Sequence, residues 1–416
     1  VAADVGVAAN DTARLGLVHV DDGGFREDSG YRQTKAFLAG DLEARGGDLT
    51  LWVSVSDLDQ ETAGFIFGED AYRDDALNRA NLNPEAFRDA SSQRLGARWQ
   101  GRVGRFELDV RPFLRHSDME FLQHFLPGQP LEENGHVSGG VLTMFRADTK
   151  DSSLSFGLDV EAADVFLRET QFGPTEGSDF LRETRPEGKH YDYDVDSLAV
   201  AAFVQAEFDV GENVVLSAGL RAEHLRYDYV NNMLDGNTRD DGTPCGFGGC
   251  LYTRPADRSD TFTDLAPKLG ARWRLGESAV VYANLARGFR APQMTELYRL
   301  QSGQQVSDLD SETIDSFELG LRTGGERWSL DGALFAMQKR DSVFRDAEGF
   351  NVSGGRSRHE GVELAWGLQL HDFWRLAANG TWARHTYDFD VVAARGETFT
   401  SGNDVDTAPH WQGSAE

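Results

Sequence analysis

A run of potential metal ligands lies in the segment GKHYDYDVD, residues 188–196, where His190, Asp192, Asp194 and Asp196 occupy every second position. On a β-strand, alternate side chains share one face, so these side chains could hold a divalent cation together. The competing interpretation is an acidic loop rim in contact with water. We favour the loop rim, and we therefore predict no metal site in this segment.

The chain contains two cysteines, Cys245 and Cys250, in the segment PCGFGGCLY. A zinc or redox site would require further ligands nearby, whereas a small disulfide-closed loop requires only this pair. The intervening glycines allow the backbone to turn back tightly. We favour the disulfide, which in turn indicates an oxidising location outside the cytoplasm.

Other chemistry finds little support in the sequence. No nucleophile, base and oxyanion donor stand out, and the paired carboxylates of a glycosidase cannot be placed from sequence. We therefore predict no catalytic residues, no cofactor and no enzymatic activity. The 416 residues carry 41 basic and 69 acidic side chains, a formal net charge of −28, which would repel a nucleic acid partner.

The elements that must position these side chains are strands with a period of two. In RFELDVRPFLRH, residues 105–116, apolar and charged residues alternate. The apolar side consists of Phe106, Leu108, Val110, Pro112 and Leu114. The charged side consists of Arg105, Glu107, Asp109, Arg111 and Arg115. This pattern fits either a half-buried strand of a soluble sheet or a barrel wall with lipid outside and a hydrated lumen inside.

Segment length and loop order favour the barrel wall. Roughly sixteen or seventeen segments alternate in this way, each about 10 to 16 residues long, whereas globular strands have about 5 to 6 residues and bilayer-crossing strands about 9 to 11. Short turns are expected at 10–12, 46–47, 103–104, 149–151, 210–212, 275–277, 323–326 and 370–372. Long loops are expected between them, at 22–31, 58–91, 117–135, 168–195, 230–261, 290–311, 341–355 and 388–407. We predict an all-β fold, an antiparallel up-and-down transmembrane β-barrel with short turns on one side and long loops on the other.

Further features agree with a barrel. The sequence contains no run of about 18 apolar residues, so we predict no transmembrane helix. Trp99, Trp273, Trp328 and Trp374 lie near short turns, and their repeated position favours an aromatic girdle over ordinary half-buried strand residues. The chain begins with neither Met nor a basic stretch typical of a signal peptide, so we expect a piece of a longer protein.

Several segments are similar to the β-barrel of TonB-dependent outer-membrane receptors. VVYANLARGFRAPQMTELYRL (280–300) resembles the GFRAP…EL segment of that family. It is followed, in the order of the family, by SETIDSFELGLR (311–322), WSLDGALFAMQKRDSVF (328–344) and NVSGGRSRHEGVELAW (351–366). The densest similarity covers about residues 262–390. The ordered set is fairly specific, although no single segment is.

The resemblance implies a barrel of about 22 strands around a globular plug, and the import of scarce nutrients with energy from the TonB–ExbB–ExbD system. The chain departs from this pattern because it shows no plug, too few strands and no final strand that ends in an aromatic residue. We therefore predict that residues 1–416 are a partial barrel domain that lacks the plug and the last strands.

The function implied by the resemblance is an active-transport receptor for a ferric siderophore or similar chelate. It would lie in the outer membrane of a Gram-negative bacterium, in contact with lipid and lipopolysaccharide. The alternatives are a passive porin-like channel, a receptor of the same family for a glycan or cobalamin, and a secreted all-β binding or enzymatic protein.

For contact with a small-molecule chelate we expect aromatic, basic and amide side chains in the extracellular half of the lumen and in the loops. The candidates are His124, Phe125, His190, Tyr191, Arg287, Arg290, Glu296, Tyr298 and Gln301. For Arg287 and Arg290 we favour a structural role, as lumen arginines paired with acids such as Glu318.

Overall fold

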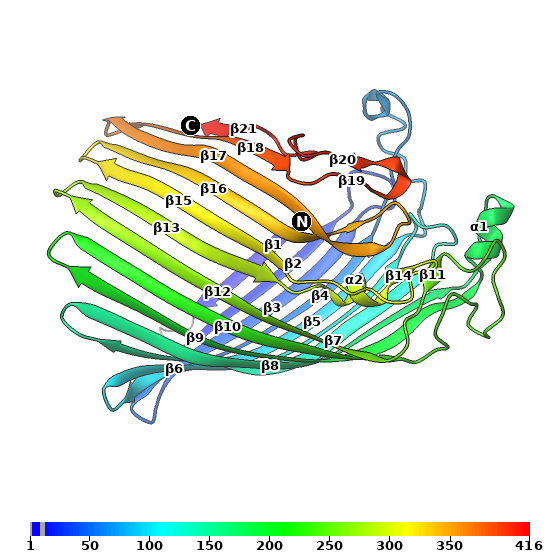
Figure 1. Ribbon diagram of the computed structural model, residues 1–416, viewed down its shortest axis with the longest axis horizontal. Coiled ribbons are helices and arrows are strands. Elements are labelled where there is room, and N and C mark those ends of the chain that lie inside the picture. The colour runs from blue at the N-terminus through cyan, green and yellow to red at the C-terminus, as the bar shows by residue number, and fades with distance from the viewer. Residues whose placement is uncertain (1, 9–12) are drawn as a thin grey trace.

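The computed structural model describes residues 2–8 and 13–416, and its main element is one curved antiparallel sheet of 17 strands (Figure 1). Each strand pairs with the next sheet strand along the chain, which is an up-and-down order. In the described residues, β1 and β21 form the two edges. The strands are β1 (Ala2–Ala8), β2 (Ala13–Asp22), β3 (Tyr31–Ala44), β4 (Gly47–Glu61), β5 (Phe87–Val103), β6 (Phe106–Leu122), β7 (Leu131–Asp148), β8 (Ser152–Gln171), β9 (Gly188–Val210), β10 (Val214–Asn231), β12 (Arg258–Leu275), β13 (Ala279–Arg290), β15 (Glu312–Gly324), β16 (Trp328–Arg345), β17 (Asn351–His371), β18 (Trp374–Tyr387) and β21 (Trp411–Ala415).

The remaining elements belong to the long loops. They are two short helices, α1 (Asp179–Thr184) and α2 (Met294–Tyr298), two 3-10 turns at Ala71–Arg73 and Ala394–Gly396, and two small two-stranded sheets that pair β11 (Tyr252–Thr253) with β14 (Leu300–Gln301) and β19 (Val391–Val392) with β20 (Thr398–Phe399). Neither helix of the described chain has the length or the apolar character needed to span a bilayer.

Short turns and long loops lie at opposite ends of the sheet, as the sequence predicts (Figure 1). Residues 45–46, 149–151 and 276–278 are turns at one end, whereas 62–86 and 232–251 are loops at the other. The turn expected at 10–12 lies outside the described residues. The all-β, up-and-down architecture and the number of strands expected from the sequence are therefore confirmed.

The strands extend further toward the long-loop end than predicted. β9 has 23 residues and β17 has 21, against the predicted range of about 10 to 16. The loop boundaries predicted at 117–135 and 341–355 are wrong, because β6 and β7 are separated by 123–130 only, and β16 and β17 by 346–350 only.

The sequence does not predict this extension as strand, because the outer face is polar and the inner face apolar there, the reverse of the rest of the strand. In β9, even-numbered residues from Asp192 onward face outward, and Leu198 and Phe208 on that face are 46% and 51% exposed. Closer to the long loops, the same face carries Asp194 and Asp196, while Tyr193 on the inner face is buried. The strand is therefore apolar outside and polar inside along one part, and acidic outside and aromatic inside along the other.

The part of the sheet nearer the short turns follows the predicted alternation. In β6, Leu114 is 59% exposed on the outer face. Asp109 on the inner face is buried and bound by Arg98 at 2.6 Å and Arg111 at 2.8 Å. The tryptophans expected as a girdle, Trp99, Trp273, Trp328 and Trp374, all lie in strands on the outer face, near short turns.

Candidate ligand-binding site

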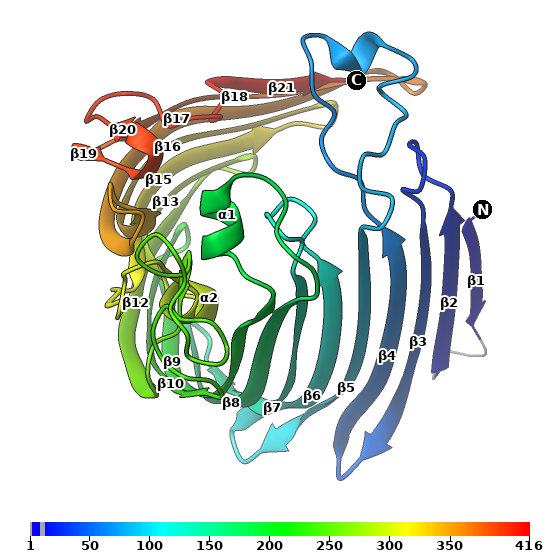
Figure 2. The ribbon, with the colours of Figure 1, turned by 90° about the vertical axis from the view of Figure 1, so that its right-hand side faces the viewer.

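The inner face of the sheet at the long-loop end, here called the mouth, carries a buried aromatic cluster. Tyr193 of β9, Tyr229 of β10 and Tyr298 of α2 are each at most 2% exposed. The rings of Tyr229 and Tyr298 stack with their centroids 4.3 Å apart. Because Tyr298 belongs to the loop 291–311, this packing anchors the loop within the concave side of the sheet (Figure 2).

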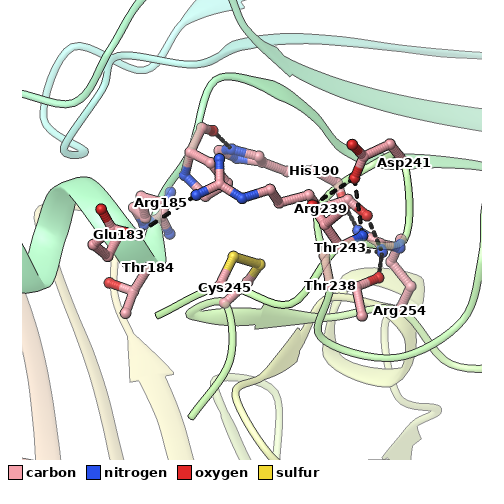
Figure 3. The surroundings of a disulfide bond; sticks show 12 residues. Glu183, Thr184, Arg185, His190, Thr238, Arg239, Asp241, Thr243, Cys245 and Arg254 are labelled. Atoms are coloured by element: carbon pink, nitrogen blue, oxygen red, sulfur yellow. Dashed lines mark hydrogen bonds and ion pairs between the residues drawn. A yellow bond between two sulfur atoms is a disulfide. The ribbon is translucent and has the colours of Figure 1, made fainter. Parts of the chain in front are cut away.

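A second loop is anchored beside the first. The disulfide predicted between Cys245 and Cys250 is present, with the two Cα atoms 5.0 Å apart. Tyr252 lies just after the disulfide and belongs to β11, which pairs with β14 of the loop 291–311. Arg254 is 1% exposed and donates to the carbonyl oxygen of Thr238 at 2.9 Å and to its hydroxyl at 3.0 Å (Figure 3). These contacts fix the shape of the disulfide loop, because a buried guanidinium needs acceptors.

A buried ion network ties these loops to the wall of the sheet. Arg299, the residue after α2, donates to Glu132 of β7 at 2.7 Å and also to Glu169 of β8. Glu169 is 1% exposed and contacts Nδ1 of His190 at 2.9 Å. Burial would lower the pKa of Arg299, but the charges of Glu169 and Glu132 outweigh burial and raise it. The network therefore holds the loop 291–311 across the mouth against β7 and β8.

Between these loops and the wall lies a cavity of about 500 Å³. Aromatic rings, guanidinium groups and amides share its surface, a combination that suits a polar ligand with flat or anionic parts. The lining residues are Gln123, Phe125, Leu126, Glu169, Arg185, Tyr191, Leu251, Tyr252, Thr295, Glu296, Arg299, Gln301, Val343, Phe344, Arg345 and Asn351.

The lining of this cavity carries three arginines and two glutamates, so positive charge is in excess. Both carboxylates of the lining, Glu169 and Glu296, are engaged in ion pairs. Arg185 and Arg345 make no side-chain hydrogen bond or ion pair within residues 13–416, and Nη1 of Arg185 is buried without an acceptor. A buried donor without a partner costs about 1 to 3 kcal/mol. An anionic oxygen placed in the cavity would remove that cost.

A larger cavity, of about 780 Å³, lies at the opposite end of the lumen, near the short turns. It is lined by charged residues such as Asp48, Arg102 and Glu107 and by no aromatic ring. Its Arg102 and Glu107 pair with each other and are largely exposed. The mouth cavity is the better candidate site because it combines aromatic faces with unpaired guanidinium groups.

The structure brings some of the predicted contact residues together. Phe125, Tyr191, Glu296 and Gln301 all line the mouth cavity. The Tyr191 hydroxyl donates to the carbonyl oxygen of Leu300 at 3.0 Å, and burial raises the pKa of this hydroxyl. These residues come from three different segments, so the cavity exists only when the loops are folded into the mouth.

Other predicted contact residues lie beside the cavity. His190 is fully buried, with its ring nitrogens occupied by Glu169 and by the carbonyl oxygen of Pro186. Tyr298 is also fully buried and donates to Asp260 at 2.8 Å. His124 packs edge-on against Phe125 and does not line the cavity.

The two arginines of the RGFR segment have structural partners, as we favoured, but not the partner proposed. Arg290 lies on the inner face and binds Glu312 at 2.9 Å and Glu296 at 3.1 Å. Arg287 lies on the outer face and binds Asp315 at 2.7 Å. Neither contacts Glu318 in the residues that the structure describes. Arg287 is thus separated from the mouth cavity by the wall itself.

The interpretation of 188–196 as an acidic loop rim is wrong, because the segment is the first part of β9. Asp192 is buried and pairs with Lys189 at 2.5 Å and with Arg168 at 3.4 Å. Within the described ranges, no group of three or more His, Cys, Asp or Glu side chains is arranged to hold a metal ion.

Several residues that line the mouth cavity are not predicted from the sequence. Arg185 and Asn351 lie in or beside loops without periodicity, and nothing local to them signals a site. Arg299 follows the predicted Tyr298 directly, but its partners are 130 and 167 residues away. Tyr252 follows the cysteine pair that the sequence did single out.

Comparison with known proteins shows the family of the chain. Residues 21–416 match the family described as TonB dependent receptor-like, beta-barrel. The chain belongs to this family. In receptor barrels of this kind, short turns face the periplasm and long loops face the cell exterior.

Individual relatives of the TonB-dependent receptor family are distant. The chain is 23% identical over 271 residues to the Rhizobactin receptor of Rhizobium meliloti (strain 1021), which aligns 59% of this chain with 35% of the relative. Among solved structures, the ferric citrate transporter FecA matches with a TM-score of 0.73 and 16% identity, over 100% of this chain and 59% of FecA. The chain thus spans little more than half of FecA.

Other solved structures with the same fold are named for different cargoes. The copper transporter OprC matches with a TM-score of 0.69 and 15% identity over 92% of this chain and 58% of OprC. The ferric yersiniabactin uptake receptor FyuA from Yersinia pestis matches with a TM-score of 0.70 and 13% identity, over 99% of this chain and 62% of FyuA. At such identities these structures establish the fold, and the cargo has to be argued from the site.

Proposed function

We propose that residues 1–416 are the barrel domain of a longer outer-membrane receptor that imports an anionic ferric chelate, most simply a ferric siderophore. Import would be driven through TonB, ExbB and ExbD, and the outer band of the barrel would contact lipid and lipopolysaccharide. The observation that carries the proposal is the mouth cavity, where Arg185 and Arg345 are unpaired in a chain of net charge −28.

The charge of the cavity and of the whole chain indicates the class of ligand. A strongly acidic surface repels anions, so unpaired guanidinium groups in a partly enclosed cavity are the place where an anionic chelate gains most. Guanidinium groups bind carboxylate oxygens through short, charge-assisted hydrogen bonds. Phe125, Tyr252 and Phe344 add flat apolar surface for the organic part of the chelate.

The loops that form the cavity suggest how binding reaches the rest of the receptor. Glu296, Arg299 and Gln301 all belong to the loop 291–311, which also packs on the aromatic cluster. A ligand held by Arg185 on one side and by this loop on the other would stabilise the closed arrangement of the mouth. That differential stabilisation is the energetic requirement for a binding-induced change.

Uptake of radioactive iron by iron-starved cells tests the proposal, with the full-length receptor, ferric rhizobactin and ferric citrate as probes. We expect uptake of at least one chelate to require both the receptor and TonB. An Arg185→Gln, Arg345→Gln double variant should raise the half-saturating concentration about tenfold or more. The matched control is Arg226→Gln, which removes an arginine paired with Asp228 on the outer face.

The outcome separates the proposal from its alternatives. Uptake that persists without TonB would contradict energised import and favour a porin-like channel. A receptor that binds cobalamin or a glycan, but neither ferric chelate, would contradict the proposed cargo. Equal uptake by the double variant and the control would show that the mouth arginines do not contact the ligand.

A further inference from the structure

Two histidines face each other on the inner wall at the long-loop end, outside the mouth cavity. His359 of β17 and His385 of β18 are direct cross-strand partners. Their Nδ1 atoms are 2.8 Å apart, and Nε2 of His359 is 2.9 Å from the hydroxyl of Ser357. At this distance one Nδ1 carries a proton and donates it to the lone pair of the other Nδ1, because a hydrogen bond between imidazoles needs one donor and one acceptor.

A thioether lies on the next strand. Met337 of β16 is the direct cross-strand partner of His359. Its neighbours Leu334 and Ala336 are exposed on the outer face, so Met337 lies on the inner face with the histidines. Directly opposed residues have Cβ atoms about 4.5 to 5.5 Å apart. Met337, His359 and His385 therefore form a row across three neighbouring strands.

The surroundings keep the row free of competing charge. The cation nearest this row on β16, Lys339, is itself bound to Glu312 at 3.1 Å. None of the three donors is a carboxylate, and hard cations such as Mg²⁺ or Ca²⁺ require oxygen ligands.

We propose that His359, His385 and Met337 bind a soft monovalent cation, with Cu⁺ as the natural candidate. Imidazole nitrogens and a thioether are the donor set that copper prefers over Mg²⁺, Ca²⁺ or Mn²⁺. The cation would take the place of the shared proton, which passes through solvent to Nε2 of the ring that loses it, so each ring keeps one N–H and offers one lone pair, and no electron transfer is involved. Typical metal–nitrogen distances of about 2 Å require the rings to separate by about 1 Å.

This site goes beyond the proposed import of a ferric chelate, since its residues do not line the mouth cavity. Both imidazoles are only partly buried, so a rotation of either ring can open the space between them. The site offers a second kind of ligand a place on the wall through which cargo would pass.

Metal titration of the purified full-length receptor in detergent tests the site, with Ag⁺ as the air-stable probe for a soft monovalent cation. Affinity is measured by competition with a soluble chelator. We expect His359→Ala and His385→Ala each to weaken Ag⁺ binding more than about tenfold, and Met337→Leu to weaken it several-fold. The matched control, His224→Ala, removes a histidine that is hydrogen-bonded to Thr263 on the outer face and should leave binding unchanged.

Folding and specificity have their own readouts. Heat-modifiable migration on a gel must match that of the parent receptor for every variant compared, and His359→Gln replaces His359→Ala if the latter fails this criterion. X-ray absorption at the silver edge should show two nitrogen neighbours and one sulfur. Ag⁺ binding that survives both histidine substitutions would overturn the site. If Met337→Leu leaves the affinity for Ag⁺ unchanged and the receptor binds Zn²⁺ more tightly than Ag⁺, the assignment of the site to a soft cation would be overturned.

Discussion

The membrane part of the barrel and its mouth are built from the same strands with opposite polarity. In β10, Leu216 and Leu220 are exposed on the outer face nearer the short turns, and Arg221 faces the lumen. Nearer the long loops, Arg226 is on the outer face and Tyr229 is buried inside. The alternation continues without interruption along the pairing with β9. The medium that each face meets, lipid or water outside and water or packed loops inside, therefore decides which residues it carries.

The same contrast governs the charges. In the membrane part, ion pairs such as Arg322 with Asp331 line a hydrated lumen, and the arginine is 69% exposed. In the mouth, Glu169 and His190 are buried and depend on each other and on Arg299. Exposed ion pairs contribute little to stability, whereas removal of one partner from a buried network leaves an uncompensated charge. The mouth should therefore be far more sensitive to substitution of a charge.

The largest effect is expected for Arg299→Met. The substitution leaves Glu132 and Glu169 buried without their cation and should destabilise the closed loop 291–311 by about 3 to 5 kcal/mol. Hydrogen exchange in this loop and its cleavage by protease measure the effect in the full-length receptor. Arg322→Gln is the control and should change neither. Equal protection in both variants would show that the buried network does not hold the loop.

The next effect belongs to the outer face of the membrane part. Leu269 of β12 is 58% exposed on that face. Arginine at this position should cost about 2 to 4 kcal/mol if it lies near the bilayer midplane. Thr263→Arg on the same strand and face, beyond the apolar band, should cost little. Denaturant titration in lipid vesicles measures both, and similar costs would contradict the polarity boundary.

The sequence predicts the membrane part well because its signal is local. Period-two alternation, turn spacing and the cysteine pair all lie within a few residues, and they predict the strand order, the alternate placement of turns and loops, and the disulfide. The spacing of Arg287 and Arg290 also indicates which face each side chain occupies. Residues three apart on a strand face opposite sides, so only one of these arginines could reach the lumen.

The mouth was harder to predict because its contacts are distant in sequence. Arg299 meets acids that belong to β7 and β8, and no spacing rule connects them. The acids of HYDYDVD are interpreted from sequence as a loop rim in contact with water, whereas the structure places them in β9. A shift of tyrosine and aspartate between faces is in fact a usable signal for the height at which a barrel strand leaves the bilayer.

A smaller and more selective effect concerns two tyrosines that stack on each other in the mouth. Tyr298 donates to Asp260 at 2.8 Å, whereas the hydroxyl of Tyr229 is buried without a partner. Loss of a hydrogen bond to a charged group costs about 1.5 to 3 kcal/mol, so Tyr298→Phe should destabilise the mouth. Tyr229→Phe should be neutral or stabilising. Hydrogen exchange of the loop 291–311 compares the two variants, and equal losses would contradict the assigned hydrogen bonds.

The smallest effect is the response of the mouth to mild acid. Burial would raise the pKa of Glu312, but hydrogen bonds from Arg290, the Val343 amide and Lys339 lower it to about 2. A carboxyl group with a depressed pKa stabilises the folded state above its ordinary pKa of 4.5, and this contribution is lost as the pH falls from there toward 2. Acidification from pH 7 to about 4 should therefore remove no more than about 1 kcal/mol of loop stability through this group.

Glu312→Gln isolates that contribution from those of other acids. Glutamine keeps the size of the side chain but cannot titrate, so loop protection in the variant should fall less between pH 7 and 4 than in the parent receptor. Hydrogen exchange at both pH values gives the difference. Because Lys339 and Arg290 share this carboxylate, the variant should also be less protected than the parent receptor at pH 7. An identical acid response in both proteins would assign the pH dependence to other carboxylates of the mouth, with the buried Glu169 as the next one to substitute.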